Sequence, residues 1–307
     1  SYFVWLNRGK TSITLDLVTP EGKAELARLL GDADILVQNL KRGALARLGF
    51  TFDRLKTEYP ALVTCSITGY GDNGPMADRK AYDLLIQAES GLCSITGGPA
   101  EPARVGLSVV DIATGATAYS AILEALLRRG VTGKGATISV SMFDVIADWL
   151  TVPLLNHEGG KSPRRVGMAH PSIAPYGAFT AGDGSQILIA VQSDREWARL
   201  CADFLGRPEL GSDPRFATNT ARVRNRADTD AAVSDGFAAR TGLEVIEGLQ
   251  RAEVAFASVN DMAGLSAHPH LRRITVDTPG GPVSMPAPAP VWHGETPCYG
   301  PVPALNP

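Results

Sequence analysis

The sequence predicts an α/β protein of two domains, the larger one built on a parallel sheet. Strand-like and helix-like segments alternate through the first half, which is typical of a parallel sheet covered by helices. The stretch 158–172 (EGGKSPRRVGMAHPS) is rich in glycine, proline and cations and indicates a linker. The 307 residues, 44% of them hydrophobic, suffice for one large or two moderate cores.

The elements expected in the first half follow from hydrophobic periodicity and from capping residues. Short apolar runs rich in valine and isoleucine suit buried strands, whereas apolar residues at helical spacing indicate helices. Proline favours the first turn of a helix, and glycine favours its end. In order, these signals predict a strand at 12–17, a helix at 20–33 with Gly31 near its end, strands at 35–37 and 62–67, a helix that follows Asp111, a strand at 137–142 and a helix at 143–157.

The second half has fewer strand signals and ends in a proline-rich tail. A strand is expected at 186–192, a helix from Asp194, as its N-cap, to Gly206, and helical structure over 229–251. The tail contains too much proline for a helix and should be extended. The expected organisation is therefore a large domain (1–157), a linker (158–172), a small α/β domain (173–277) and a tail (278–307) that returns to the large domain.

Composition excludes several classes of function. A net charge of −3 and a pI near 6.0 provide no overall field for nucleic acid or an anionic membrane. The four cysteines are far apart and form no metal-binding pair, so no metal is expected. The opening residues lack the pattern of a signal peptide, and no apolar run approaches the ~20 residues that span a bilayer. A cytoplasmic protein is the expectation.

The motifs of several common enzyme classes are missing. The sequence contains no GxGxxG or GxxxxGK[ST] loop, which weakens the case for dinucleotide oxidoreductases and P-loop enzymes. It also contains no HExxH and no GxSxG, which argues against a zinc protease and an α/β-hydrolase.

A series of short motifs, in a fixed order, extends over almost the whole chain. They are LNRGK (6–10), ADILVQN (33–39), GALARLG (43–49), SITGYG (66–71), NGP (73–75), YDLLIQAESG (82–91), Val110-Asp111 with Thr114-Gly115, and TGKG (132–135). Each motif is weak alone, but in this order and spacing the sequence resembles the family III CoA-transferases. Residues 142–179 with 259–269 look most like the branch that uses succinyl-CoA and mesaconate, itaconate or citramalate.

The resemblance implies a fold, a reaction and a partner. It implies a Rossmann-like large domain with a smaller α/β domain, in an interlocked homodimer. It also implies a CoA-transferase whose acyl-CoA thioester is a substrate, with no permanently bound cofactor, and whose acceptor is a small carboxylic acid. Transfer could run between two molecules or within one dicarboxylate. The family's N-terminal strand and helix and its C-terminal helix have no counterpart here, so we expect the sequence to be a fragment, a cleaved form or an incompletely traced chain, between which the sequence does not distinguish.

Asp111 matches the catalytic aspartate of the family. A carboxylate can attack a thioester carbonyl to give a mixed anhydride and a free thiolate. Asp111 also precedes a predicted helix, whose first-turn N–H groups favour negative charge. From residue type and position alone, an N-cap aspartate is the simpler interpretation; the family resemblance favours a nucleophile.

The resemblance also implies contacts to CoA and to the acceptor acid. Cations within these motifs would otherwise be ordinary solvated surface charges. A guanidinium at Arg47 suits a phosphate, and further cations would bind the distal carboxylate of the acceptor. The implied CoA contacts are Leu6, Asn7, Arg8, Gly9, Asn39, Leu40, Lys41, Arg47, Lys80, Ala81, Tyr82 and Asp83, and the candidates for the acceptor are Arg104, Arg164, Arg165 and His170.

Two alternatives remain. The related 2-methylacyl-CoA racemases carry a histidine where this chain has Tyr82, and a neutral phenol is a poor base near pH 7. A non-catalytic CoA-binding protein is the second alternative, and the presence of Asp111 argues against it. The glycine-rich loop of formyl-CoA transferases is also missing, which argues against oxalate–formate exchange.

Overall fold

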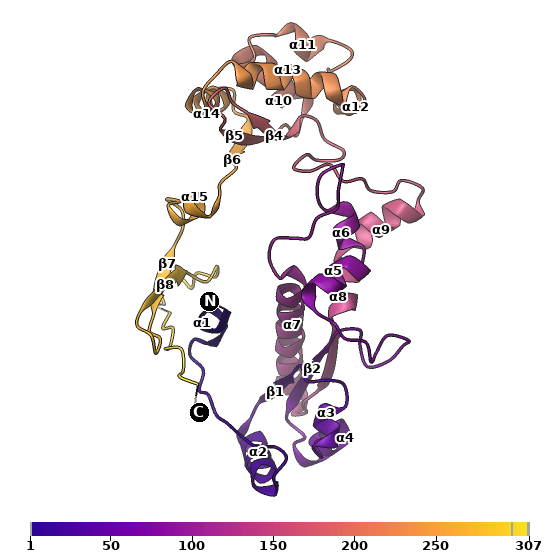
Figure 1. Ribbon diagram of the computed structural model, residues 1–307, viewed down its shortest axis with the longest axis vertical. Coiled ribbons are helices and arrows are strands. Elements are labelled where there is room, and N and C mark those ends of the chain that lie inside the picture. Colours follow the sequence, from indigo (N-terminus) through magenta and orange to yellow (C-terminus); the bar gives the residue numbers. More distant parts are fainter. Residues whose placement is uncertain (1, 296, 306–307) are drawn as a thin grey trace. The chain divides into compact units, whose positions relative to one another are not determined.

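The chain has a mixed α/β fold with a parallel sheet, and the computed structural model describes residues 2–295 and 297–305 (Figure 1). Its contacts group into two compact units. One unit comprises Ala33–Val259, and the other combines Ser1–Asp32 with Asn260–Pro307.

The larger unit contains the parallel sheet, in the order β1-β2-β3. Its strands are β1 (Ile35–Gln38), β2 (Val63–Thr68) and β3 (Thr137–Ser141). Ile35 is paired with Val63, and Thr64 with Thr137. The first four residues of β2 are buried, as expected for a central parallel strand covered on both faces. The three strands predicted in this region are confirmed.

Helix α7 (Val109–Thr132) packs against β2 and β3 and confirms the helix expected after Asp111. Near its last turn, Arg129 donates to the carbonyl of Ala61 (3.0 Å) and pairs with Asp34 (2.8 Å), at the amino ends of β2 and β1. The helix therefore runs against the strand direction, and its first turn lies toward the carboxyl ends of the strands. Among the described residues, α7 alone is long and apolar enough to cross a membrane, and its buried residues belong to the core beneath the sheet.

Shorter helices complete this part of the unit. They are α3 (Ala44–Arg47), α4 (Phe52–Glu58), α5 (Asp83–Glu89), α6 (Leu92–Ile95), α8 (Met142–Trp149) and α9 (Thr151–Glu158). The single helix predicted at 143–157 was wrong, because the chain breaks at Leu150 into α8 and α9. Pro153 is the third residue of α9, where proline removes no intrahelical hydrogen bond.

A second core in the same unit lies beneath an antiparallel sheet. Strand β5 (Gln186–Ala190) runs between β4 (Tyr176–Thr180) and β6 (Ala255–Ser258), and confirms the strand predicted there. The surrounding helices are α10 (Asp194–Arg199), the π-helical turn η1 (Leu200–Phe204), α11 (Glu209–Ser212), α12 (Asn219–Arg224), α13 (Arg226–Ala238) and α14 (Gly242–Arg251). Trp197, Phe204 and Phe237 are among the side chains that fill this core.

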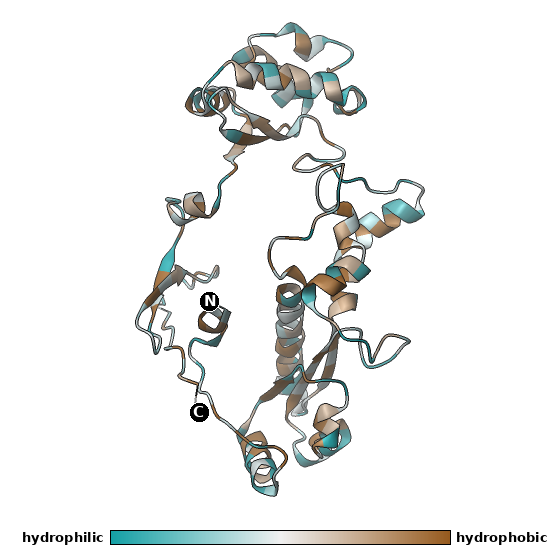
Figure 2. Cartoon of the chain, in the orientation of Figure 1, coloured by the Kyte–Doolittle hydropathy of each residue, from teal (hydrophilic) through white to brown (hydrophobic). Residues whose placement is uncertain are grey.

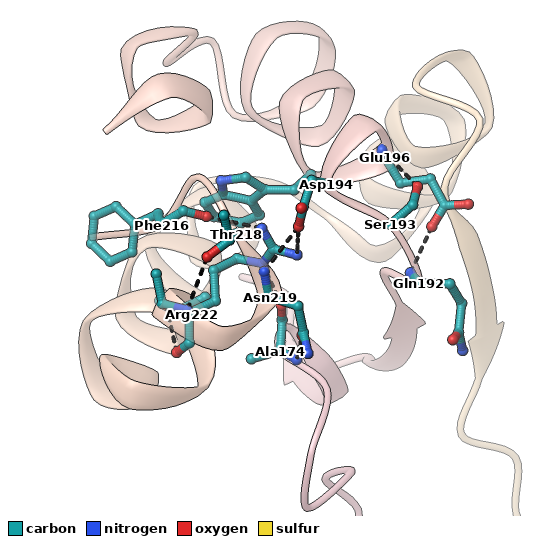
Figure 3. Close-up of polar contacts among 12 residues, drawn as sticks. Ala174, Gln192, Ser193, Asp194, Glu196, Phe216, Thr218, Asn219 and Arg222 are labelled. Carbon is teal, nitrogen blue, oxygen red and sulfur yellow. Dashed lines mark hydrogen bonds and ion pairs between the residues drawn. The ribbon is translucent and has the colours of Figure 1, made fainter. Parts of the chain in front are cut away.

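Arg222 is a fully buried cation beside this core (Figure 3). It donates to the carbonyls of Ala174 (2.6 Å) and Phe216 (2.9 Å) and to the carboxylate of Asp194 (2.9 Å). The N-cap predicted at Asp194 was wrong: Ser193 caps α10 by accepting from the Glu196 N–H. The carboxylate of Asp194 instead accepts a hydrogen bond from Arg222, because the neighbouring Ser193 already caps the helix.

The smaller unit joins the beginning of the chain to its tail. It contains α1 (Tyr2–Asn7), α2 (Pro20–Asp32), α15 (Met262–Ser266), and the antiparallel strands β7 (Arg273–Val276) and β8 (Val283–Pro286). Helix α2 confirms the helix predicted from Pro20. The Gly9 N–H donates to the carbonyl of Pro301 (2.8 Å), and Val4 packs on a small core that includes Val302.

The strand predicted at 12–17 was wrong. Residues 11–16 have no regular secondary structure. The carboxylate of Asp16 accepts from the Val18 N–H (3.0 Å), and Thr19 caps α2 through the Gly22 N–H (3.1 Å). These local hydrogen bonds favour a turn over an extended strand.

Candidate functional site

The carboxyl edge of the parallel sheet gathers several of the residues expected to bind CoA. Ligands of open α/β sheets bind outside the carboxyl ends of the strands. Asn39, Leu40 and Lys41 follow β1 directly, and Lys41 lines a small cavity with Ser66 and Thr68 at the end of β2. The cavity also receives Gln38, whose side chain bonds to Ser66 and accepts from the Leu40 N–H (2.7 Å). These contacts order the segment that carries Lys41.

The segment from Lys80 to Asp83 is held against the end of β2. A Cβ atom on Gly69 would lie 2.1 Å from the Cβ of Ala81, so this close approach requires glycine at position 69. Tyr82 is the N-cap residue of α5, and its ring is exposed. Asp83 is the first residue of α5.

Asp111 is the third residue of α7, and Ser108 occupies the N-cap position. The expectation that Asp111 precedes the helix was therefore wrong, because Val109 and Val110 already belong to the first turn. Although Asp111 is exposed, the surrounding protein partly desolvates its carboxylate and raises its pKa, and the negative charge of Asp83 raises that pKa further. Desolvation and a like charge thus outweigh the helix dipole, which was expected to keep Asp111 ionised.

This coupling predicts a pH effect. With Asp111 as the nucleophile expected from the sequence, the ionised form is lost as the pH falls through its pKa, so the acid limb of kcat/KM, which reports the free protein, should lie above the ordinary aspartate range. Asp83→Asn removes the like charge, lowers the pKa of Asp111 and should move this limb to lower pH. The measurement is a pH–rate profile of both proteins. An acid limb that stays in place or moves upward would show that Asp83 does not act on the titrating group.

Gln87 completes this cluster and was not singled out in the sequence. Its side chain is 1% exposed. Its amide nitrogen donates to both carboxylate oxygens of Asp83, at 3.1 and 3.2 Å, and its amide oxygen accepts from the Val105 N–H at 2.9 Å. One sequence feature could have identified Gln87: it is a polar residue next to Ile86 and four residues after Asp83, on the same face of the helix as Asp83.

The cations expected to bind the acceptor differ in their surroundings. Arg165 donates to the carbonyls of Gly98 and Ser94, both at 3.1 Å, so its guanidinium supports the loop after α6. Arg104 and Arg164 are exposed. The His170 ring stacks on Tyr176 with 5.2 Å between centroids.

Arg47, expected at a phosphate, donates to the carbonyl of Arg42 (3.3 Å), and its side chain is otherwise near the backbone of Gly43. Leu6, Asn7, Arg8 and Gly9 belong to the smaller unit, whereas the other predicted residues belong to the larger one. Within the smaller unit, Arg8 donates to the carbonyl of Trp5 (3.0 Å) and lies over the Tyr299 ring.

No group of three or more histidine, cysteine, aspartate or glutamate side chains within residues 2–295 and 297–305 could hold a metal ion. Cys65 and Cys201 are buried, and burial raises the pKa of the Cys201 thiol to about 12. At the site itself, the carboxylates of Asp83 and Asp111 interact electrostatically.

Comparisons with known proteins match the whole chain. The model of CoA-transferase family III matches residues 1–306. The succinate–glutarate CoA-transferase of Agrobacterium fabrum is 35% identical over 303 residues, which cover 97% of this chain and 75% of that protein. The succinyl-CoA–D-citramalate CoA-transferase of Chloroflexus aurantiacus is 33% identical over 73% of this chain and 56% of that protein. A crystal structure of a CAIB/BAIF family protein from Brucella suis has a TM-score of 0.84 and 36% identity, covering 99% of this chain and 81% of that one.

Proposed function

The chain belongs to CoA-transferase family III, and from that premise we propose that this transferase moves CoA from succinyl-CoA to a four- or five-carbon dicarboxylic acid. The observation that carries the proposal is the carboxylate of Asp111, exposed in the first turn of α7 and close enough to Asp83 to be affected by its charge. The names of relatives that use succinate, glutarate or citramalate support the substrate class.

Asp111 acts as a nucleophile in this proposal. Its carboxylate attacks the thioester carbonyl of the donor, and the C–S bond breaks. CoA departs as the thiolate, and an acyl–aspartyl anhydride remains on the protein. The thiolate then attacks the aspartyl carbonyl, which releases the donor acid and forms an aspartyl–CoA thioester. The acceptor carboxylate repeats these two steps in reverse, restoring the free carboxylate of Asp111. No net proton transfer is needed, and no permanently bound cofactor takes part.

CoA is proposed to lie along the carboxyl edge of the sheet. Lys41 and Arg47 follow β1, and they would meet its phosphates. The exposed Tyr82 and the backbone of Lys80 and Ala81 would border the thioester's path to Asp111. Leu6, Asn7, Arg8 and Gly9 remain proposed contacts of the nucleotide.

Arg104 is the best candidate for the second carboxylate of the acceptor. It is exposed and lies in the loop that leads into α7. The guanidinium of Arg165 is already bonded to carbonyl oxygens, so a role in folding the loop is better supported than substrate binding. Arg164 and His170 remain candidates.

The deciding experiment is acceptor specificity. Wild-type protein is incubated with succinyl-CoA and a panel of mesaconate, itaconate, citramalate, glutarate, oxalate and butyrate, and the CoA esters are identified by mass spectrometry. We expect the four- and five-carbon diacids to be preferred. Arg104→Ala should raise KM for a diacid about tenfold or more, since it removes a charge-assisted hydrogen bond worth ~1.5–3 kcal/mol, and should change KM for butyrate much less. Equal use of butyrate by the wild type would refute the dicarboxylate assignment.

The protein is further proposed to be an interlocked homodimer. A stripe of exposed apolar side chains at four-residue intervals on α7 supports a covered face: Tyr119, Leu123, Leu127 and Val131. Figure 2 colours the residues of the chain, α7 included, by hydropathy. In this proposal, a second copy of the chain covers this face of α7.

Leu127→Glu tests this face, because a buried unpaired carboxylate opposes association. We expect light scattering at increasing protein concentration to show a dimer for the wild type and a shift toward monomer for the variant. Arg128→Glu, which places the same residue next to the stripe, is the matched control and should stay dimeric. A wild type that is monomeric throughout would exclude the homodimer.

A further inference from the structure

Gln87 is a buried amide for which packing alone gives no reason. The residue is on α5, and the adjacent Ile86 is completely buried in the core beneath the sheet. An amide in such surroundings costs free energy unless its polar atoms are hydrogen-bonded. Both ends of the Gln87 amide have partners, which come from two different segments of the chain.

The partners of Gln87 allow one orientation of the amide. The Val105 N–H can only donate, so it requires the amide oxygen, at 2.9 Å. The ionised carboxylate of Asp83 can only accept, so it requires the amide nitrogen, which lies 3.1 and 3.2 Å from its two oxygens. A reversed amide would place like partners together at both ends.

Both segments that Gln87 connects belong to the proposed site. Asp83 is the charged group whose effect reaches Asp111. Val105 belongs to the loop between α6 and α7, next to Arg104 and six residues before Asp111. A single side chain therefore ties the second carboxylate to the loop that precedes the nucleophile.

We propose that Gln87 is a positioning residue, which holds the carboxylate of Asp83 and the loop at Val105 in the arrangement that CoA transfer at Asp111 requires. The proposal rests on the transferase function proposed above. Gln87 does not touch the reacting atoms; it acts through Asp83 and through the loop backbone.

The test compares Gln87→Met, which keeps the length and removes all three hydrogen bonds of the amide, with Asp83→Asn and with the double variant. In Gln87→Met, kcat should fall about tenfold to a hundredfold, the scale expected for a misplacement of about 1 Å near reacting groups, while KM for succinyl-CoA changes little. The double variant should lose less than the product of the two single losses, because both changes act on one network.

A second readout does not depend on activity. Titration of the Asp111 carboxyl by carbon-13 NMR should show a lower pKa in Gln87→Met than in the wild type, shifted in the direction expected for Asp83→Asn, because Gln87 no longer holds Asp83 where its charge acts on Asp111. Thr64→Val is the matched control: it removes a buried hydroxyl from β2, bonded to the carbonyl of Ala136, and should change neither kcat nor this pKa.

These readouts separate the inference from the function on which it rests. A wild type that transfers no CoA to any acid refutes the proposed function, and the NMR titration still decides whether Gln87 positions Asp83. A Gln87→Met protein with unchanged kcat and an unchanged Asp111 pKa overturns the inference. Equal losses of kcat in Gln87→Met and Thr64→Val would show that Gln87 only supports the fold and does not position Asp83.

Discussion

Asp111→Asn is expected to lower CoA transfer by at least about a thousandfold, because an amide cannot form the acyl–aspartyl anhydride. Asparagine has the same shape as aspartate, and the Asp111 side chain is exposed, so the fold should be unchanged. The measurement is single-turnover transfer from succinyl-CoA, with mass spectrometry of the intact protein to detect the CoA adduct. That adduct should form in the wild type and be missing from the variant.

Asp111→Asn should not destabilise the protein near neutral pH. The pKa of Asp111 is raised by desolvation and by Asp83, so its ionised form is less favourable in the folded than in the unfolded state. This cost is present at pH values above the folded-state pKa, and disappears as the pH falls below the unfolded-state value. Asparagine removes it, so the variant's thermal midpoint should equal or exceed that of the wild type near neutral pH, with the difference shrinking in acid.

Asp228→Asn is the matched control for the nucleophile, since Asp228 is an exposed aspartate at the same third position of a helix, α13. It should keep wild-type activity. An Asp111→Asn protein that retains a tenth of wild-type activity would remove Asp111 from the nucleophilic role. Loss of activity together with loss of the fold would point to a structural role instead.

Arg222→Met is expected to cost about 3–5 kcal/mol of stability, because it leaves two backbone carbonyls without their donor and the half-exposed Asp194 without its cation. The guanidinium is completely buried and donates to two carbonyl oxygens and to Asp194 (Figure 3). The guanidinium carbon, Cζ, also lies 5.3 Å from the centroid of the Trp197 ring. Methionine fills much of the volume but leaves the carbonyls of Ala174 and Phe216 without this donor.

Chemical denaturation and amide hydrogen exchange over residues 173–259 measure this effect. Arg222→Lys should lie between the wild type and Arg222→Met, since an ammonium lacks the planar fork that reaches several acceptors. Arg224→Ala, at an exposed position of the same helix, is the control and should change stability little. Similar stability of Arg222→Met and the wild type would mean that the buried network contributes no net stability.

Two of the predictions that failed did so for different physical reasons. The alternation at 12–17 predicted a strand, yet the side chain of Asp16 and the cap at Thr19 stabilise a turn instead. Asp194 has a good N-cap residue type, but the adjacent Ser193 takes that role, and a buried cation 28 residues later claims its carboxylate. A competing local hydrogen-bond pattern decided the first case, and a neighbouring cap together with a contact from a distant segment decided the second.

The sequence by itself determined the family, through motifs in a fixed order, and the central strands β1, β2 and β3 with helix α7, through periodicity and glycine. Periodicity and the order of motifs are properties of the sequence itself, so both can be recognised without coordinates. Only the tertiary structure decided that Gln87 joins Asp83 to Val105, that Arg165 supports a loop, and that Asp83 acts on the pKa of Asp111. Those facts depend on distances between segments far apart in the sequence, and on the desolvation that packing produces, which no local pattern encodes.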